Sequence, residues 1–221
     1  MVLEEIKKDV QKRNVIRSVV KGSKTDLTYY ILLSVSTLII TLGLTLDSTP
    51  TVIGGMLMAP MLKPILAFGL GAATLSPKAI LRSFLGILNS IAIILILSYL
   101  MSNLIHSNNY LTSEIMDRVV YSNLYLFIAV LSGLGATYTL LVPNVESALP
   151  GVAVSISLLP PLCVSGISLA QSNMEFLINS SRIFMVNLGG IILASFFIFF
   201  IFRFARLKRH EEKTIVEEEK N

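Results

Sequence analysis

VIGGMLMAPMLKPILAFGLG, at residues 52–71, has the apolar character of a membrane segment, yet it contains two prolines and four glycines. A second apolar stretch, ALPGVAVSISLLPPLCVSGISLA at residues 148–170, is interrupted in the same way by Pro150, Gly151, Pro160, Pro161 and Gly166. A proline inside a helix removes one backbone N–H donor and clashes with the carbonyl group one turn earlier. We therefore expect neither stretch to form a straight helix.

The composition of the whole chain places it among membrane proteins. Of its 221 residues, 53% are hydrophobic and only 14% are charged, whereas about a quarter of the residues of a soluble domain are charged. Thirteen of the 18 Lys and Arg residues lie in residues 1–24 and 203–221, outside the apolar body. This distribution excludes a soluble globular domain.

Hydropathy predicts six apolar segments of 20 to 23 residues, each long enough to cross a hydrocarbon core of about 30 Å as a helix. No period-two alternation of a membrane barrel is present, so helices are expected. The predicted segments are 27–46, 51–73, 79–101, 121–142, 149–170 and 183–204. The second and the fifth are the two interrupted stretches.

The positions of the cations predict the orientation. With a cytoplasmic N-terminus, fifteen Lys and Arg residues face the cytoplasm, only Arg118 and Arg182 lie outside, and Lys63 remains in the membrane. The predicted location is the cell membrane, with a multi-pass chain and both termini in the cytoplasm. Because the 143–148 connection carries Glu146 and no cation, whether segment 149–170 fully crosses the bilayer stays open.

An internal repeat appears when the sequence is shifted by 100 residues without a gap. Pro50 then pairs with Pro150, Pro60 with Pro160 and Arg82 with Arg182, and prolines and arginines are scarce here. Three segments per unit make the second copy enter the bilayer from the opposite side. The sequence thus predicts an all-α polytopic membrane protein built from two three-segment inverted repeats.

The predicted organisation has five parts. They are a basic cytoplasmic arm at 1–26, membrane repeat 1 at 27–101, a linker with a short interfacial helix at 102–120, membrane repeat 2 at 121–204 and a charged cytoplasmic tail at 205–221. The cap of the short helix is expected at Thr112 or Ser113. The basic arm either lies against anionic lipid or is a solvated arm that sets the topology.

Equivalent breaks in both halves of a membrane protein point to a transport site, because unpaired carbonyl groups at a break need protein, ion or water. The alternative is that the prolines make packing kinks. We expect Asn89 and Asn187, near the middle of the third and sixth segments, to point into the protein or to bridge subunits. The candidate site residues are Asp47, Gly54, Gly55, Pro60, Lys63, Pro64, Pro150, Gly151, Pro160, Pro161 and Asn187.

Lys63 and Asp47 each have two interpretations. Lys63 is the ionisable residue placed deep in a segment, where a charge costs about 2.5–3.5 kcal/mol, so it either contacts an anion on a wet path or snorkels to the cytoplasmic face. Asp47 either caps the helix that starts beside it or attracts cations to a mouth. Glu146 precedes the fifth segment in the equivalent place and fits both interpretations.

The strings VIGGMLMAPMLKPI and ALPGVAVSISLLPPL, with LDS at 46–48 before the first, resemble the uncharacterised hydrophobic family of bacteria and archaea called domain of unknown function 389. The similarity extends in order over residues 27–204. It implies a polytopic membrane protein, and it implies no substrate. Longer relatives carry an additional soluble N-terminal domain. Two departures from the family pattern are Leu46, where Thr is commoner, and Lys63, where a small residue is common.

Three classes of function fit such a chain. We expect a transporter or channel-like protein for an ion or small solute, with its site between 51–73 and 149–170. The alternative is a structural or signalling membrane protein that acts through its cytoplasmic termini. A membrane-embedded enzyme fits least, because the candidate groups are scattered among the connections at Asp47, His106, Glu114 and Glu146.

We accordingly expect no enzymatic activity and no cofactor. One cysteine, Cys163, and two histidines do not supply a usual zinc site, and no GxxxxGK[ST] motif is present. The expected partners are the lipid bilayer, with anionic lipid at the basic N-terminus, and further copies of the chain, because six segments in 24.2 kDa enclose little interior. We expect no nucleic acid partner.

Overall fold

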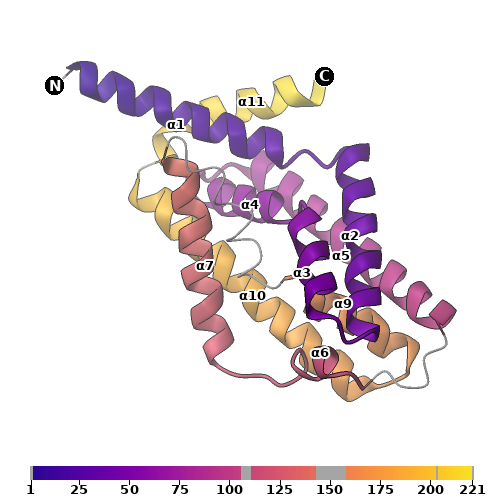
Figure 1. The fold of residues 1–221 in the computed structure, drawn as a ribbon. Helices are drawn as coiled ribbons and strands as arrows, with labels where there is room; N and C mark the ends of the chain where they lie inside the picture. The colour runs from indigo at the N-terminus through magenta and orange to yellow at the C-terminus, as the bar shows by residue number, and fades with distance from the viewer. Residues whose placement is uncertain (1, 106–110, 143–157, 203, 221) are drawn as a thin grey trace.

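The computed structural model describes residues 2–105, 111–142, 158–202 and 204–220, and every regular element within them is a helix (Figure 1). The elements are α1 (Val2–Gly22), α2 (Leu27–Thr45), α3 (Thr49–Met58), α4 (Leu62–Thr74), α5 (Pro77–Ile105), α6 (Ser113–Met116), α7 (Leu124–Leu141), α9 (Leu159–Ala170), α10 (Met174–Ile201), the 3₁₀ helix η2 (Phe204–Leu207) and α11 (Lys208–Lys220).

In the described part of the chain, four helices are long and apolar enough to cross a membrane, namely α2, α5, α7 and α10. The pair α3 and α4 is a fifth candidate, bent by 51°. The described part of the protein is therefore all-helical, and its long apolar helices are compatible with a multi-pass membrane protein. The predicted count of six spans and their inverted repeat are not confirmed, because the described part of the fifth segment is the 12-residue helix α9.

The break in the second predicted segment lies where the prolines predict it. α3 ends at Met58, α4 begins at Leu62, and Ala59 between them has extended backbone angles. At the break, the Ala59 N–H donates to the Met56 carbonyl at 3.3 Å, and one turn earlier the Ser36 hydroxyl donates to the Gly55 carbonyl at 2.7 Å. Side chain and backbone donors thus satisfy carbonyl groups that the bend removes from the helical ladder.

The two short helices α4 and α9 are the most enclosed elements of the bundle. Residues 159–168 of α9 are buried without exception, and most of α4 is buried as well. Pro160 and Pro161 occupy the first turn of α9, where N–H groups have no partner inside the helix. Because proline has no N–H, these two residues reduce the number of donors left unpaired at a buried helix end.

The contacts of the short helices have a reciprocal pattern. α4 packs on α5 and α10, while α9 packs on α10 and α5. At both crossings between the two halves a glycine of the short helix meets a serine of the long one, Gly69 against Ser195 and Gly166 against Ser98. The inverted repeat stays a prediction, and these contacts are the observations that bear on it.

The first and last helices lie side by side at one end of the bundle (Figure 1). Val15, Ile16, Val19 and Val20 of α1 are buried in a cluster with residues of α4, α5, α10, η2 and α11. The C-terminal half of α1 therefore packs on the protein itself and is not a free solvated arm. α6 lies at the opposite end, beside the turn between α2 and α3.

Candidate functional site

A cavity of about 560 Å³ lies over the α3–α4 break, at the end of the bundle that carries α1 and α11. Four parts of the chain meet around it: the end of α1, the start of α2, the break itself and the end of α7 at Leu140. Its polar lining includes Lys21, Lys24, Asp26, Thr28 and Lys63. Among the described lining residues, the charged ones are thus three lysines and one aspartate, so the cavity has a cationic wall.

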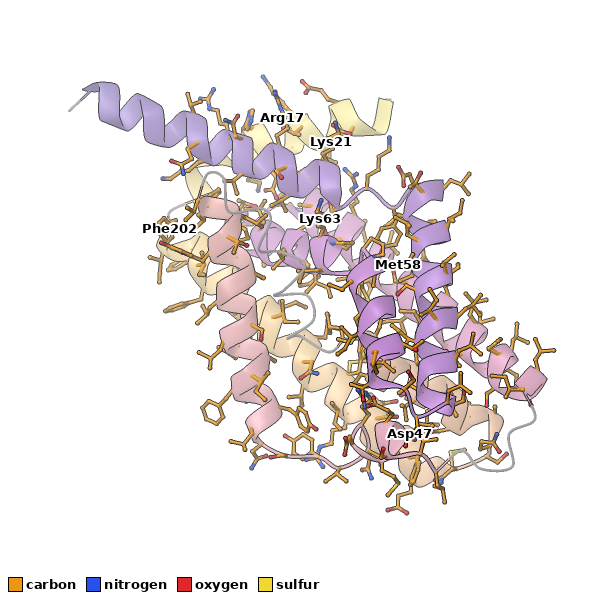
Figure 2. The ribbon with its side chains drawn as sticks, in the orientation of Figure 1. Arg17, Lys21, Asp47, Met58, Lys63 and Phe202 are labelled. Carbon is orange, nitrogen blue, oxygen red and sulfur yellow. The ribbon has the colours of Figure 1, made fainter. Side chains whose placement is uncertain are left out.

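Lys63 is exposed and its side chain lies against the last residue of α1. A Cβ atom added to Gly22 would approach the Lys63 Cδ to 2.4 Å, so the lysine stem occupies the space that the missing side chain of Gly22 leaves. Figure 2 shows Lys63 beneath the end of α1, with Lys21 above it. The bend of 51° between α3 and α4 accompanies this position, which brings Lys63 close to the end of α1.

Asp26 and Tyr29 fix the opposite wall of the cavity. The Asp26 carboxylate caps α2 by accepting the Tyr29 N–H at 2.9 Å. The Tyr29 ring is buried, and its hydroxyl is hydrogen-bonded to the Ser90 hydroxyl of α5 at 2.7 Å. The aspartate in the wall is therefore already engaged with the backbone of α2.

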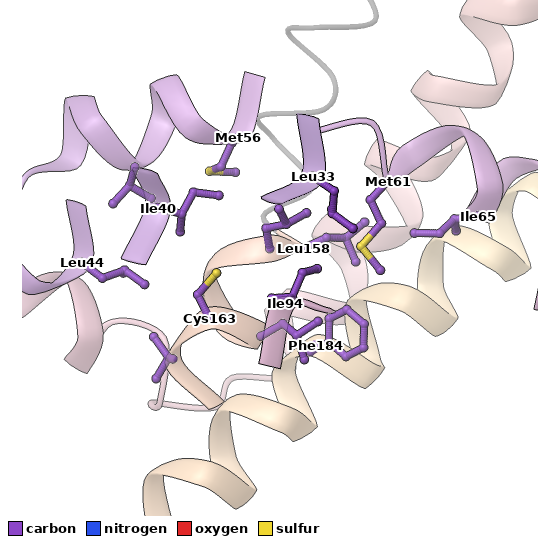
Figure 3. Close-up of a cluster of buried hydrophobic side chains, with 14 of the residues drawn as sticks. Leu33, Ile40, Leu44, Met56, Met61, Ile65, Ile94, Leu158, Cys163 and Phe184 are labelled. Atoms are coloured by element: carbon purple, nitrogen blue, oxygen red, sulfur yellow. The ribbon is translucent and has the colours of Figure 1, made fainter. Parts of the chain in front are cut away.

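Below the cavity the two predicted broken segments meet through apolar side chains. Met56 and Met61 flank the break, and Leu158 at the start of α9 lies beside them with Leu33 of α2 (Figure 3). Cys163 and Phe184 belong to the same buried cluster. The break is thus bordered by a buried apolar layer that includes Met56, Met61 and Leu158.

Asp47 lies far from this cavity, at the opposite end of α3 (Figure 2). Its carboxylate accepts the backbone N–H of Glu114 at 2.9 Å and the hydroxyl of Ser113 at 2.8 and 2.9 Å. These hydrogen bonds, the Glu114 one first, lower the pKa of Asp47. Asp47 thus caps α6, a helix of another segment. Capping of α3, one of its two predicted roles, is not seen, and the cap residue of α3, Ser48, makes no side-chain cap.

The other predicted site residues are dispersed. Pro60 lines the cavity, and Pro64 is buried in the first turn of α4. Gly54 is exposed, whereas Gly55 faces Ile40 of α2. Asn187 is buried in α10, as expected, while Asn89 is exposed on α5 and does not point into the protein. Pro150, Gly151 and Glu146 lie outside the described residues.

The predicted short helix between 102 and 120 exists as α6 with its cap at Thr112, which accepts the Ile115 N–H at 3.3 Å. Ile115 and Val119 are buried in the main core, so this side of the segment faces the protein. Lys21 and Lys24 were not among the predicted site residues. Hydropathy assigned them to the arm, and no local signal in the sequence connects that arm to the break.

The family described as Domain of unknown function (DUF389) matches residues 56–193. The chain belongs to this family. Its residues are also 26% identical over 191 positions to Uncharacterized protein MJ0678 of Methanocaldococcus jannaschii, in an alignment that covers 84% of this chain and 57% of that relative. This chain therefore spans little more than half the length of that relative. No solved structure matches.

In this DUF389 chain, α11 packs on α1, the helix that carries Lys21, and also contacts the end of α4. Glu211 of α11 is buried, and the Thr74 hydroxyl at the end of α4 donates to its carboxylate. Glu212 accepts from the Ser76 hydroxyl at 3.5 Å. Burial raises the pKa of Glu211 to about 7, with the Thr74 hydrogen bond acting in the opposite direction.

The docking of α11 is expected to weaken as the pH rises from about 4.5 to about 7. In an undocked helix Glu211 has its ordinary pKa of 4.5, so the docked state binds more protons within this interval. The stabilisation is fully present below 4.5 and is lost as the pH rises through about 7, with a size of roughly 3 kcal/mol at most. Hydrogen exchange of the α11 amides at about pH 5 and about pH 8 measures it.

Glu211→Gln should keep α11 protected at the higher pH, and Glu217→Gln, at an exposed position of the same helix, is the matched control. The contribution of His210 to the docking of α11 has the opposite pH dependence, because burial and then Arg13 and Arg17 lower the pKa of His210. Its contribution is lost as the pH falls below 6.5 and is common to wild type and Glu211→Gln, whereas Glu217→Gln also removes a carboxylate that raises the pKa of His210. Equal exchange of wild type and Glu211→Gln at both pH values would contradict the prediction.

Proposed function

We propose that this protein moves an ion or small solute across the cell membrane, and that the cavity over the α3–α4 break receives the solute at the end where both termini lie. The observation that carries the proposal is the coincidence of a broken span with a cavity that has a charged lining. Solute sites of transporters commonly lie where membrane helices are interrupted and backbone groups are free to bind.

The position of α9 supports the same proposal. α3 and α9 are in contact, so the two interrupted segments predicted from the sequence approach each other in the fold. The apolar layer of Met56, Met61 and Leu158 lies beside the break. In the proposed mechanism this layer closes the path, and movement of α3 or α9 opens it.

The orientation and the assembly state belong to the proposal too. Both termini are placed in the cytoplasm, because thirteen of the 18 cations lie in residues 1–24 and 203–221. A homo-oligomer is proposed because Asn89 presents an amide on the otherwise apolar outer face of α5, beside Leu85 and Leu88. An asparagine that faces another subunit finds a hydrogen-bonding partner that lipid does not provide. We also propose that the protein has no enzymatic activity and uses no cofactor.

A flux assay in liposomes tests the function. The purified full chain is reconstituted, and the movement of a panel of inorganic ions and small solutes is measured for wild type, Lys63→Ala and Lys78→Ala. Lys78 is an exposed lysine at the same end that does not line the cavity, so it is the matched control. We expect flux in wild type and in Lys78→Ala, and a reduction of about tenfold in Lys63→Ala, the loss of one charge-assisted contact.

Absence of flux across the panel, from protein that is monodisperse and melts cooperatively, would contradict the transport function. The second candidate, a structural or signalling role, would then take precedence. The packing of α1 on α11 favours this second role, since it joins both terminal helices into one surface at one end of the bundle.

A further inference from the structure

We infer that the cavity over the α3–α4 break binds the phosphate group of an anion, carried either by a free solute or by a lipid headgroup. The inference names the ligand class of the site under the proposed function and rests on that proposal.

The charge of the wall favours an anion with more than one negative charge. Lys21, Lys24 and Lys63 line the cavity, and Asp26 already accepts the N–H of Tyr29. Three ammonium groups around one space repel each other unless an anion or water lies between them. A phosphate carries a charge of about −1.5 to −2 at neutral pH and has three strong acceptor oxygens, so it can engage several lysines at once.

Backbone donors add to this charge. The rim of the cavity includes the first residues of α4, Leu62 and Lys63, and α4 is 13 residues long. Met61 in the cap position supplies no side-chain hydrogen bond, and Pro64 has no N–H. The opening N–H groups of α4 and the positive end of its dipole are therefore free of a side-chain cap, next to the lysines.

The floor of the cavity suits the remainder of a phosphate-bearing molecule. Leu57, Met58, Leu62, Leu66 and Leu140 line it, and Leu57 and Met58 are also exposed on the outer surface of α3. A volume of about 560 Å³ exceeds what a phosphate alone fills and lies in the range of small-molecule sites. An apolar group attached to the phosphate can rest on this floor.

Gly22 sets the position of the Lys63 ammonium group. The Lys63 stem crosses Gly22 so closely that a Cβ atom there would overlap with its Cδ at 2.4 Å and approach its Nζ at 3.1 Å. A larger residue at 22 must displace the lysine while every charge remains. Gly22→Leu therefore changes the position of the Lys63 ammonium group and leaves the net charge of the site unchanged.

Isothermal titration calorimetry on the full chain in a neutral maltoside detergent tests the inference. One arm uses inorganic phosphate, the second uses dihexanoyl phosphatidic acid, whose headgroup is a phosphate monoester, and chloride at equal ionic strength controls for screening. The proteins are wild type, Lys63→Gln, Lys24→Gln, Gly22→Leu and the control Lys78→Gln. Size-exclusion profiles and melting curves establish that each variant is folded.

We expect wild type and Lys78→Gln to bind at least one of the two probes, and the three cavity variants to bind it about tenfold more weakly, since a hydrogen bond to a charged group contributes about 1.5–3 kcal/mol. Binding of phosphate identifies a free solute as the source; binding of the short-chain lipid alone identifies a headgroup. No binding of either probe by wild type, or equal binding by wild type and both lysine variants, would overturn the inference. Because binding is measured without flux, a failure of transport leaves a positive result standing, and flux of a cation without anion binding overturns the inference alone.

Discussion

Gly166→Ala is expected to lower the free energy of unfolding by about 1–3 kcal/mol, the usual cost of an additional methyl group in a packed interior. The Cβ atom would lie 1.9 Å from the Ser98 Oγ and 2.9 Å from the Leu95 carbonyl oxygen of α5. Ser98 cannot turn away without losing its 2.6 Å hydrogen bond to the Ile94 carbonyl. Unfolding in a denaturant series in micelles measures the effect.

The reciprocal crossing provides a second instance of the same effect. At Gly69 of α4 a Cβ atom would lie 1.8 Å from the Ser195 Oγ of α10, so Gly69→Ala should be destabilising as well. Ser98→Gly combined with Gly166→Ala should restore part of the lost stability, because it removes the overlapping atom. Gly54→Ala and Gly135→Ala are the controls, since nothing lies within 4 Å of their added methyl groups. If Gly166→Ala were as stable as these controls, the close crossing of α9 and α5 would be wrong.

Arg118→Gln is expected to cost about 3–5 kcal/mol, because it leaves a buried carboxylate without its counter-charge. Glu114 is only 6% exposed, and its Oε2 lies 2.8 Å from the Arg118 Nη1. Arg118 also donates to the Glu114 carbonyl, and the Thr49 hydroxyl donates to the Glu114 carboxylate. The contacts of Glu114 with Arg118 and Thr49 join α6 to the first turn of α3, at the end of the bundle opposite the cavity over the α3–α4 break.

The double variant Glu114→Gln with Arg118→Gln distinguishes the cost of an unpaired buried charge from the cost of the altered side-chain packing. It should recover much of the stability, because a neutral amide at 114 carries no uncompensated charge. Asp117→Asn, at an exposed carboxylate three residues from Glu114, should remain within about 0.5 kcal/mol of wild type. A double variant less stable than Arg118→Gln alone would show that burial of the charge is not the source of the cost.

The candidate site was only partly predictable. Pro60 and Pro64 act on the backbone of their own segment, so the position of the break between Met58 and Leu62 follows from local chemistry. The neighbours of Lys63 in the cavity do not follow from local chemistry. Lys21 and Lys24 come to the cavity because α1 packs on α4 through Val15, Ile16, Val19 and Val20, and that packing depends on residues distant in the chain.

Asp47 illustrates the same limit. A capping role is a local preference of aspartate, and the sequence predicts it. Which helix is capped depends on where the 111–120 segment lies, and the fold brings Ser113 and Glu114 to Asp47 across more than 60 residues of chain. Arg118, predicted only as one of two outside cations, pairs with Glu114 four residues earlier in the chain, and the packing of this segment against α3 buries the Glu114 carboxylate.

The sequence by itself determined that this is an all-helical membrane protein, where its long apolar helices run, and that the second segment is interrupted. Those features follow from apolar length and from the geometry of proline, which act within a few residues of the chain. Only the tertiary structure decided that Lys63 lies in a cationic cavity at the terminal end, that Asp47 caps α6, and that α4 and α9 cross the opposite long helices through Gly69 and Gly166. These features depend on contacts between distant segments, and hydropathy and spacing carry no information on which apolar surfaces meet.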